Sequence, residues 1–233
     1  MLTYGFIFAR GGSKELPGKN IRSFGGRPLL THTIELASSI VEIDQIFVST
    51  EDSAIGEVAK AADVTVIPRP DKLAQDDTPE WLAWKHAVDW VENVVGPFDR
   101  FVSLPVTSPL RASEDVTRCL DALSDQVDMI VAISESIRNP WFNMVTVGEN
   151  GFLKTVCTPE GEGHIHRRQD CPATFDLTTV AYVTTPLFIK MADGVFGGRT
   201  KGVIIPRERS IDIDTAYDFE IAECIWSARN SKA

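Results

Sequence analysis

The fold of this chain is decided by residues 4–20, which read YGFIFARGGSKELPGKN. The run Tyr4–Ala9 is apolar and short, which is typical of a buried strand and unlike the longer apolar region of a secretory signal. Two glycines directly follow Arg10. A buried strand that runs straight into a glycine-rich, cationic loop favours an α/β sheet, in which ligands bind beyond the carboxyl ends of the strands.

Downstream of this stretch, short apolar runs alternate with longer amphipathic ones. Strands are expected at Gln45–Thr50, Val64–Ile67, Arg100–Leu104 and Asp128–Ser134. Helices are expected at Pro28–Ile40, at Asp52–Ala62 behind an aspartate cap, after Thr78-Pro79, and from Ser113 to near Leu123. Strands separated by helices predict right-handed crossovers and a Rossmann-like, mostly parallel sheet with helices on both faces.

Residues 139–175 interrupt this alternation, because they are rich in glycine and proline. Two extended pieces, Met144–Val147 and Phe152–Val156, flank a turn at residues 148–151 and predict a hairpin. The alternation then returns in the segments Thr179–Thr184, Val203–Pro206 and Thr215–Ala228. We therefore expect one domain over residues 1–233, with residues 139–175 as a small inserted arm that dimerises the protein.

The composition excludes several classes of protein. A formal net charge of -10 over 233 residues argues against a nucleic-acid binder, which needs clustered positive charge. No apolar run approaches the ~18 residues that a membrane span requires. The four cysteines lie far apart and are expected to be small buried side chains. These features predict a cytoplasmic protein without nucleic-acid or membrane partners.

The loop after the first strand carries the chemistry of phosphate binding. Gly11 and Gly12 allow backbone N–H groups to approach an anion closely, and Arg10, Lys14 and Lys19 add positive charge around them. The loop matches neither the Walker pattern nor the dinucleotide fingerprint. A plain connecting turn with solvated lysines is the alternative, but it would not need this concentration of cations.

This loop also carries a family resemblance that continues through the chain. Five motifs occur in the order expected of one family: Ala9–Lys14 with Pro17 and Lys19-Asn20, Val48–Asp52, Pro68–Pro70 with Leu73-Ala74, Thr107–Arg111, and Ser210–Thr215. Together they strongly resemble the acylneuraminate cytidylyltransferases, which make CMP-sialic acid and related CMP-ulosonic acids. The fold implied is that of the nucleotide-diphospho-sugar transferases.

The resemblance implies a role for each matched residue. The CTP phosphates are assigned to the loop residues Arg10, Gly11, Gly12, Ser13, Lys14 and Lys19, with Lys19 nearest the leaving group. The cytidine side is assigned to Arg69, Asp77 and Thr78. It also implies a homodimer in which each arm reaches the neighbouring active site.

Asp212 and Asp214 form a carboxylate pair just before the last helix. Residues two apart in an extended segment project to the same side, and two carboxylates suit Mg²⁺, which takes its other oxygens from water and substrate phosphates. The alternative is that Asp214 caps the helix while Asp212 is solvated. Arg10, Lys19 and Asp214 are the candidate catalytic residues; the general base is either Asp214 or a water on the metal.

The acceptor side departs from the sialic acid enzymes. Arg168, Gln169, Tyr182 and Arg111 are the candidate sugar-binding residues, and Arg168 is expected to pair with a substrate carboxylate, although it also fits a solvated position on the arm. Pro105 replaces a glutamine of that family. Asp176 replaces an arginine of the same family, so it must point elsewhere or meet a different sugar.

These observations predict a cytidylyltransferase that joins CMP from CTP to the anomeric hydroxyl of an acidic 2-keto-3-deoxy sugar and releases pyrophosphate. In-line phosphoryl chemistry of this kind depends mainly on positioning and charge neutralisation. Two alternatives remain: a nucleotidyltransferase for another nucleoside triphosphate and a sugar phosphate, and a non-catalytic nucleotide-binding relative.

Overall fold

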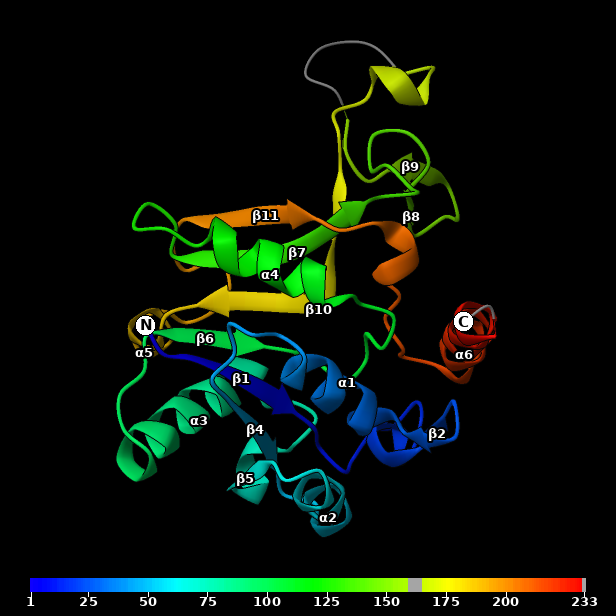
Figure 1. Cartoon of the computed structure of the whole chain (residues 1–233). Coiled ribbons are helices and arrows are strands. Elements are labelled where there is room, and N and C mark those ends of the chain that lie inside the picture. Colours follow the sequence, from blue (N-terminus) through cyan, green and yellow to red (C-terminus); the bar gives the residue numbers. More distant parts are fainter. Residues whose placement is uncertain (159–164, 232–233) are drawn as a thin grey trace.

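The computed structural model describes residues 1–158 and 165–231. Its centre is a sheet in the order β11-β7-β10-β6-β1-β4-β5 (Figure 1). The strands are β1 (Thr3–Phe8), β4 (Gln45–Thr50), β5 (Thr65–Pro68), β6 (Arg100–Ser103), β7 (Met129–Glu135), β10 (Phe175–Thr184) and β11 (Thr200–Ile204). Only β10 runs antiparallel to its neighbours, so the mostly parallel sheet predicted from the sequence is confirmed.

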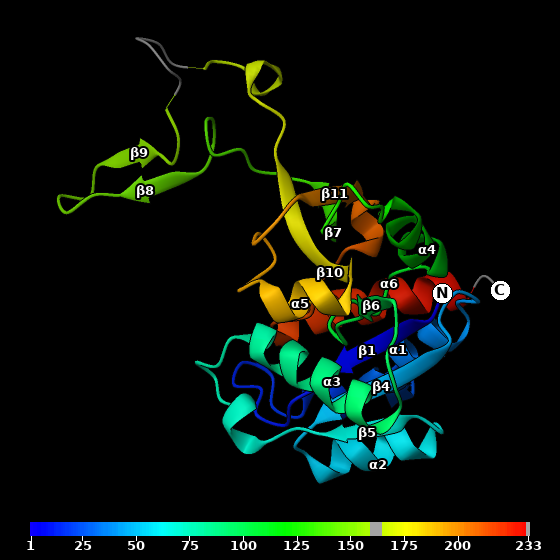
Figure 2. The same cartoon turned by 90° about the vertical axis from the view of Figure 1, so that its left-hand side faces the viewer.

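Helices cover both faces of this sheet (Figure 2). They are α1 (Leu29–Ser38), α2 (Ser53–Ala61), α3 (Glu80–Val94), α4 (Ser113–Ala122), α5 (Pro186–Met191) and α6 (Ala216–Asn230). Short 3₁₀ turns lie at Lys19–Ile21, Asp71–Leu73, Arg168–Asp170 and Arg207–Arg209. The expected helices all form with ends shifted by a residue or two, whereas α5 was not expected.

The buried strands feed two apolar cores, because successive side chains point to opposite faces. In β1, Tyr4 and Phe6 pack with Trp81 and Trp84 of α3 in one cluster. Ile7 lies in the other cluster, with residues of α1, α2, α4 and α6. This two-sided burial fixes β1 in the middle of the sheet, with β4 on one side and β6 on the other, all three parallel. Their carboxyl ends therefore meet at one edge.

Local caps explain where individual helices begin. The side chain of Asp52 accepts hydrogen bonds from the backbone of Ala54 (2.8 Å) and Ile55 (3.0 Å) at the start of α2. Thr215 and Asp218 form a reciprocal capping box at the start of α6. A two-stranded ribbon, β2 (Ser23–Phe24) and β3 (Arg27–Pro28), precedes α1.

The arm projects well beyond the sheet (Figure 1). Its hairpin pairs β8 (Val145–Val147) with β9 (Leu153–Thr155) in antiparallel register, as the sequence predicted. The return limb enters the main sheet as the first half of β10. Residues 159–164 of the expected arm lie outside the described residues. In the described ranges, no helix combines the length and the apolar character needed to cross a bilayer.

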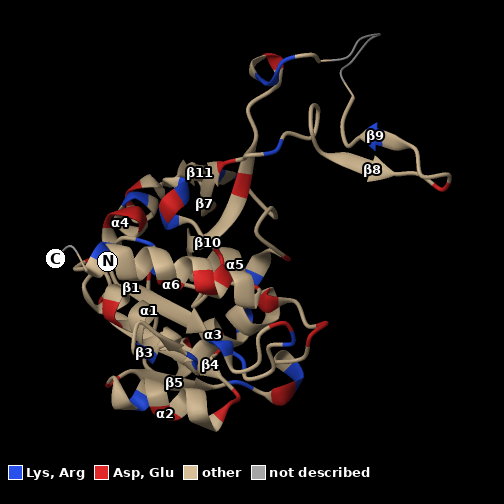
Figure 3. Ribbon diagram, turned by 90° about the vertical axis from the view of Figure 1, so that its right-hand side faces the viewer, with Lys and Arg blue, Asp and Glu red and all other residues tan. Residues whose placement is uncertain are grey.

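The surface of the hairpin is largely uncharged (Figure 3). Its apolar side chains are exposed to solvent: Val145 by 49%, Val147 by 71%, Phe152 by 75% and Leu153 by 63%. Single exposed apolar residues are common on protein surfaces, whereas here four of them lie on one projecting ribbon.

Candidate active site

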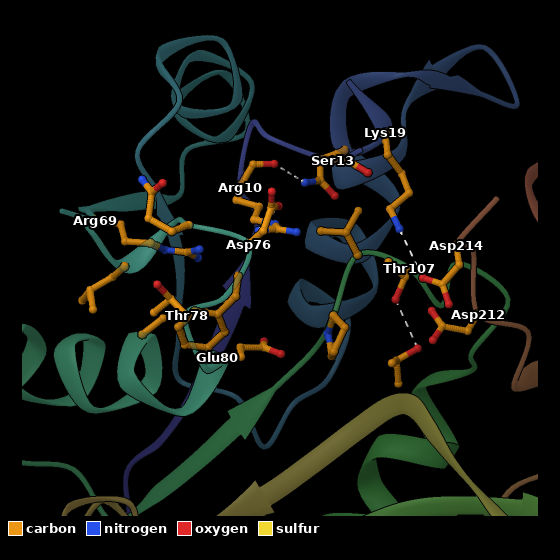
Figure 4. A pocket seen from close by; sticks show the side chains of 18 of the residues that line it. Arg10, Ser13, Lys19, Arg69, Asp76, Thr78, Glu80, Thr107, Asp212 and Asp214 are labelled. Atoms are coloured by element: carbon orange, nitrogen blue, oxygen red, sulfur yellow. Dashed lines mark hydrogen bonds and ion pairs between the residues drawn. The ribbon is translucent and has the colours of Figure 1, made fainter. Parts of the chain in front are cut away.

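A cavity of about 380 Å³ opens at the carboxyl edge of β1 and its neighbours (Figure 4). The loop after β1 lines one side of it, and the segment 212–214 lines another. Residues after β5 and β6, together with Thr179 and Tyr182 of β10, complete the wall. This edge is the switch point of an open α/β sheet, where neighbouring connections leave in opposite directions.

Lys19 and the aspartate pair meet across this cavity. The Lys19 ammonium group lies 3.6 Å from Asp214 and also donates a hydrogen bond to the backbone carbonyl of Ile213. Its side chain is only 12% exposed, whereas that of Asp214 is 68% exposed. The sequence predicted that Lys19 and the aspartate pair converge, and the structure brings them together; the cation is mostly buried and the Asp214 carboxylate is open.

Asp212 is the most constrained group in the cavity. Its Oδ1 atom is buried and, among the described residues, has no hydrogen-bond partner. Burial and the nearby Asp214 charge raise the pKa of Asp212, while contacts with Thr107, Thr179 and Lys19 act in the opposite direction. An incompletely satisfied carboxylate at this position is suited to bind a cation.

The segment 212–214 holds its shape because Ile213 anchors it. The Ile213 side chain is fully buried, and its N–H donates to the carbonyl of Thr107 at 2.8 Å. Asp212 and Asp214 flank this anchor and both line the cavity. Thr215, rather than Asp214, caps α6, so the alternative in which Asp214 serves as the helix cap is not what the structure adopts.

The outer cations of the glycine loop are held by a carboxylate that the sequence did not single out. Arg10 lies 2.9 Å from Asp76, and Lys14 lies 2.5 Å from the other oxygen of the same carboxylate. Arg10, Ser13 and Asp76 line the cavity; Gly12 and Lys14 line an adjoining one. Asp77, which was expected on the cytidine side, lines neither cavity, whereas its neighbour Asp76 lines both.

The two loop glycines have different surroundings. The N–H of Gly11 donates to Glu51 at 2.7 Å, so it is already satisfied within the protein. A Cβ atom on Gly11 would come within 2.3 Å of an Asp52 oxygen, which explains why this position lacks a side chain. A Cβ on Gly12 would meet nothing within 4 Å. The anion-binding nest expected from the sequence is therefore partly occupied by Glu51.

Arg69 is fixed deep in the wall. It donates to the hydroxyl of Ser49 (3.2 Å) and to the carbonyl of the same residue (2.6 Å), and its guanidinium lies 5.6 Å from the centre of the Phe8 ring. The side chain is nearly fully buried, and burial lowers its pKa. Thr78 also lines the cavity, with its hydroxyl bonded to the carbonyl of Lys72 at 3.0 Å.

Tyr182 lies on the β10 side of the cavity. Its ring packs edge-on against Trp84 at 5.5 Å. Burial, together with the charges of Glu80 and Asp212, raises the pKa of Tyr182 to about 12, so the phenol stays protonated. The β10–β7 register shifts between Leu177 and Tyr182, and such irregularities re-aim side chains near binding sites.

The other three expected sugar-binding residues lie away from this cavity. Arg111 is buried; its Nε donates to the carbonyl of Ser108 at 2.8 Å, a second nitrogen contacts the carbonyl of Pro105, and burial lowers its pKa to about 9. It braces the loop after β6 from within. Arg168 and Gln169 lie on the arm, where Arg168 donates to the carbonyl of Ser136 at 2.6 Å.

Asp176 also has a partner outside the cavity. The hydroxyl of Ser136 donates to it at 2.6 Å, so this carboxylate points away from the expected sugar position. Sequence reasoning assigned no role to several lining residues: Asn20, Asp76, Glu80 and Thr179. Asn20 had a detectable signal, because it directly follows Lys19; its amide supports the loop by donating to the carbonyl of Arg10 at 2.9 Å.

The chain was compared with known proteins and families. The chain matches the family model described as cytidylyltransferase over residues 4–225, which include both the glycine loop and the aspartate pair. The chain belongs to the cytidylyltransferase family. The resemblance drawn from the five sequence motifs is thereby confirmed.

Individual relatives of this cytidylyltransferase agree with the family. The N-acylneuraminate cytidylyltransferase of Streptococcus agalactiae is 30% identical over 218 residues, which are 91% of this chain and 50% of that protein. The chain thus spans about half the length of that relative. The CMP-N,N'-diacetyllegionaminic acid synthase of Campylobacter jejuni is 29% identical over 227 residues, covering 96% of this chain and 94% of the relative.

A solved structure shares the fold of this cytidylyltransferase. It is the CMP:2-keto-3-deoxy-manno-octonic acid synthetase complexed with CTP, which matches with a TM-score of 0.73 and 15% identity. The match covers 98% of this chain and 100% of the other. At this identity the likeness establishes the architecture, and the chemistry must be argued from the site.

Proposed function

We propose that this cytidylyltransferase transfers CMP from CTP to the anomeric hydroxyl of an acidic 2-keto-3-deoxy sugar and releases pyrophosphate. The observation that carries the proposal is the meeting of Lys19 with Asp212 and Asp214 in one cavity, beside Arg10. Cations from the first loop and acids from the last segment are what a triphosphate and its metal together require. The names of both relatives support an acceptor of the sialic acid type.

On this proposal, Arg10, Lys14 and Lys19 hold the CTP phosphates, and buried Lys19 stabilises the charge of the leaving pyrophosphate. Arg69 and Thr78 bound the cytidine side, and Asp77 directly precedes Thr78 in the sequence. Gly12 and Ser13 allow the backbone of the loop to come close to the phosphates. The fixed hydrogen bonds of Arg69 support a preorganised pocket, which lowers the entropic cost of binding.

The residues of the aspartate pair fit Mg²⁺. They offer only oxygen ligands, and the Oδ1 of Asp212, which has no hydrogen-bond partner in the described part of the chain, is available to a cation. Within the described residues, no group of three or more His, Cys, Asp or Glu side chains is arranged to hold a metal. Asp212 and Asp214 would therefore share the ion with phosphate oxygens and water. A bound Mg²⁺ supplies positive charge next to the phosphate under attack.

The proposed step is an in-line displacement. The C2 hydroxyl oxygen of the sugar forms a bond to the α-phosphorus of CTP, and the bond from that phosphorus to the bridging oxygen breaks. The electron pair leaves with pyrophosphate beside Lys19. The hydroxyl proton passes to Asp214, whose carboxylate is open to solvent. Protonated Tyr182 donates a hydrogen bond to the sugar from the opposite wall.

The arm completes this proposal through a homodimer. We propose that residues 1–233 act as one unit and that residues 139–175 of each copy reach the cavity of the other. Arg168 and Gln169, which lie away from the cavity of their own chain, then pair with the sugar carboxylate in the partner. The exposed apolar hairpin supports such a contact.

The proposal is tested by pyrophosphate release with each of the four nucleoside triphosphates, Mg²⁺, and a panel of eight- and nine-carbon keto-deoxy sugar acids. We expect release only with CTP together with a sugar acid. Release with UTP or GTP and a sugar phosphate would replace the proposal with that alternative. Nucleotide binding without turnover across the panel would identify a non-catalytic relative.

A further inference from the structure

The segment between β5 and α3, residues 70–79, brings one carboxylate onto two loop cations. Asp76 contacts Arg10 through one oxygen (2.9 Å) and Lys14 through the other (2.5 Å). Figure 4 shows Asp76 beside Arg10 at the cavity. The protein therefore already supplies an anion to two of the three cations that a triphosphate would need.

These contacts are open to water. The Asp76 side chain is 41% exposed and that of Lys14 is 78% exposed. Ion pairs with this exposure are weak and exchange readily with other anions. The hydrogen bond and charge of Lys14, together with Arg10, lower the pKa of Asp76, so the carboxylate is ionised at neutral pH.

Lys19 is held differently. Its partners are the carbonyl of Ile213 and the carboxylate of Asp214, and its side chain is 12% exposed. The structure thus divides the cations into an inner one, bound to the aspartate pair, and two outer ones, Arg10 and Lys14, bound to Asp76. Only a ligand that needs the outer cations must displace Asp76.

The rest of the segment is held mainly by its own hydrogen bonds, with one long contact (3.5 Å) from Arg10 to the carbonyl of Ala74. Gln75 donates to the carbonyl of Asp71 at 2.8 Å, and Thr78 donates to the carbonyl of Lys72 at 3.0 Å. The recorded ion pairs of Asp76, in the part of the chain that the structure describes, are those with Arg10 and Lys14. Asp76 can therefore leave them without disrupting a strand or helix.

Building on the proposed function, we propose that Asp76 competes with the terminal phosphates of the ligand for Arg10 and Lys14. It weakens the binding of every ligand that places phosphates on Arg10 and Lys14, which includes CTP and free pyrophosphate. CMP has only the α-phosphate, so Asp76 does not compete with it. The device limits rebinding of pyrophosphate after each turnover, because Asp76 returns to the two cations as the product leaves.

The test is the binding of pyrophosphate, CTP and CMP to the intact protein and to Asp76→Asn, measured by calorimetry without a sugar acceptor. Asparagine keeps the size of the side chain and removes its charge. We expect the Kd of pyrophosphate and of CTP to fall about three- to tenfold, as the loss of two exposed ion pairs implies. The Kd of CMP should change less than about twofold on the same reasoning.

Asp71→Asn is the matched control, because it removes a carboxylate from the same segment that has no recorded ion pair among the described residues. We expect it to leave all three constants unchanged. Asp76→Ser provides a second variant with the same expectation as Asp76→Asn, and thermal unfolding verifies that each variant is folded.

Unchanged or weaker pyrophosphate binding in Asp76→Asn would overturn the inference, since Asp76 would then be neutral or would itself assist the ligand. An equal fall in the Kd of CMP would also overturn it, because the effect would then be a general change in the electrostatic potential of the cavity. Failure of the proposed function gives a different result, because the intact protein would then bind CTP no more tightly than the other nucleoside triphosphates. Pyrophosphate binding would still decide the role of Asp76.

Discussion

Asp212 carries two costs in the folded protein: an oxygen that is buried without a hydrogen-bond partner among residues 1–158 and 165–231, and a second carboxylate close by. Both disfavour its ionised form, which is why its pKa is raised. A group with no function is rarely kept under such conditions. The position therefore trades stability for chemistry, and the two properties can be separated by substitution.

Replacing Asp212 with Asn should lower Mg²⁺-dependent pyrophosphate release by about 100-fold or more, because a charged ligand of the cation is lost. The same change should raise the free energy of unfolding by about 1 kcal/mol, since it relieves repulsion with Asp214 in the absence of metal. Urea unfolding in EDTA and a release assay measure the two effects. Near-normal turnover, or a destabilised variant, would contradict this account.

At the scale of single residues, the sequence predicted those whose spacing along the chain indicates their chemistry. Lys19 was predicted from the motif after the first strand, and the aspartate pair was predicted from its i, i+2 spacing. Asp76 could not be predicted in the same way, because its role arises only when residues 70–79 fold back over the glycine loop. Arg111 was expected at the sugar, but the loop after β6 turns its guanidinium inward onto backbone carbonyls.

Among the elements, those with strong caps or clear periodicity were predictable, and those set by tertiary pairing were not. The cap at Asp52 and the alternation of β1 are local properties of the chain. The ten residues of β10 were expected only as Thr179–Thr184, because its first half is extended only through pairing with β7. Six-residue α5 is too short to display a helical period.

One ion pair lies at the start of the edge pairing of β11 with β7. Asp128, just before β7, accepts from the backbone N–H of Arg199 (2.7 Å) and from its guanidinium (2.9 and 3.0 Å), and these contacts lower the pKa of Asp128 to about 2. Arg199 directly precedes β11, so the carboxylate joins the starts of two neighbouring strands.

Because this pKa is depressed, Asp128 stabilises the fold above its unfolded value of about 3.9, and the contribution disappears as pH falls through about 2. Asp128→Asn should therefore lower the urea midpoint at pH 7. The difference from the natural chain should stay constant down to about pH 4 and narrow below it. A difference that does not depend on pH would mean that the carboxylate charge is irrelevant.

For the whole molecule, the arm is the part whose proposed function needs a second copy. The hairpin was predicted from its turn and its extended flanks, but its exposure and the distance of Arg168 from the cavity of its own chain emerge only in the structure. A dimer that exchanges arms accounts for both features, because it covers apolar surface and completes the acceptor side.

Mixing two inactive variants tests this arrangement. Asp212→Asn removes the metal ligand and Arg168→Ala removes the arm contact, so each homodimer should have little activity. Random reassociation should restore about a quarter of normal turnover, because half of the dimers are mixed and each holds one intact site. Sedimentation confirms the dimer in each sample. If both variants are inactive and mixing restores no activity, each chain uses its own Arg168; an active Arg168→Ala would show that Arg168 is not used.

The contact between Lys19 and Ile213 joins residues 194 positions apart in the sequence. During synthesis, the ribosome must therefore release the segment around Ile213, long after the glycine loop, before this contact can form. A nascent chain that has emerged only through β10 presents the phosphate loop without its acidic counterpart. On the proposed function, such a partly made chain cannot turn over nucleotide until residues 212–214 have emerged and folded against the loop.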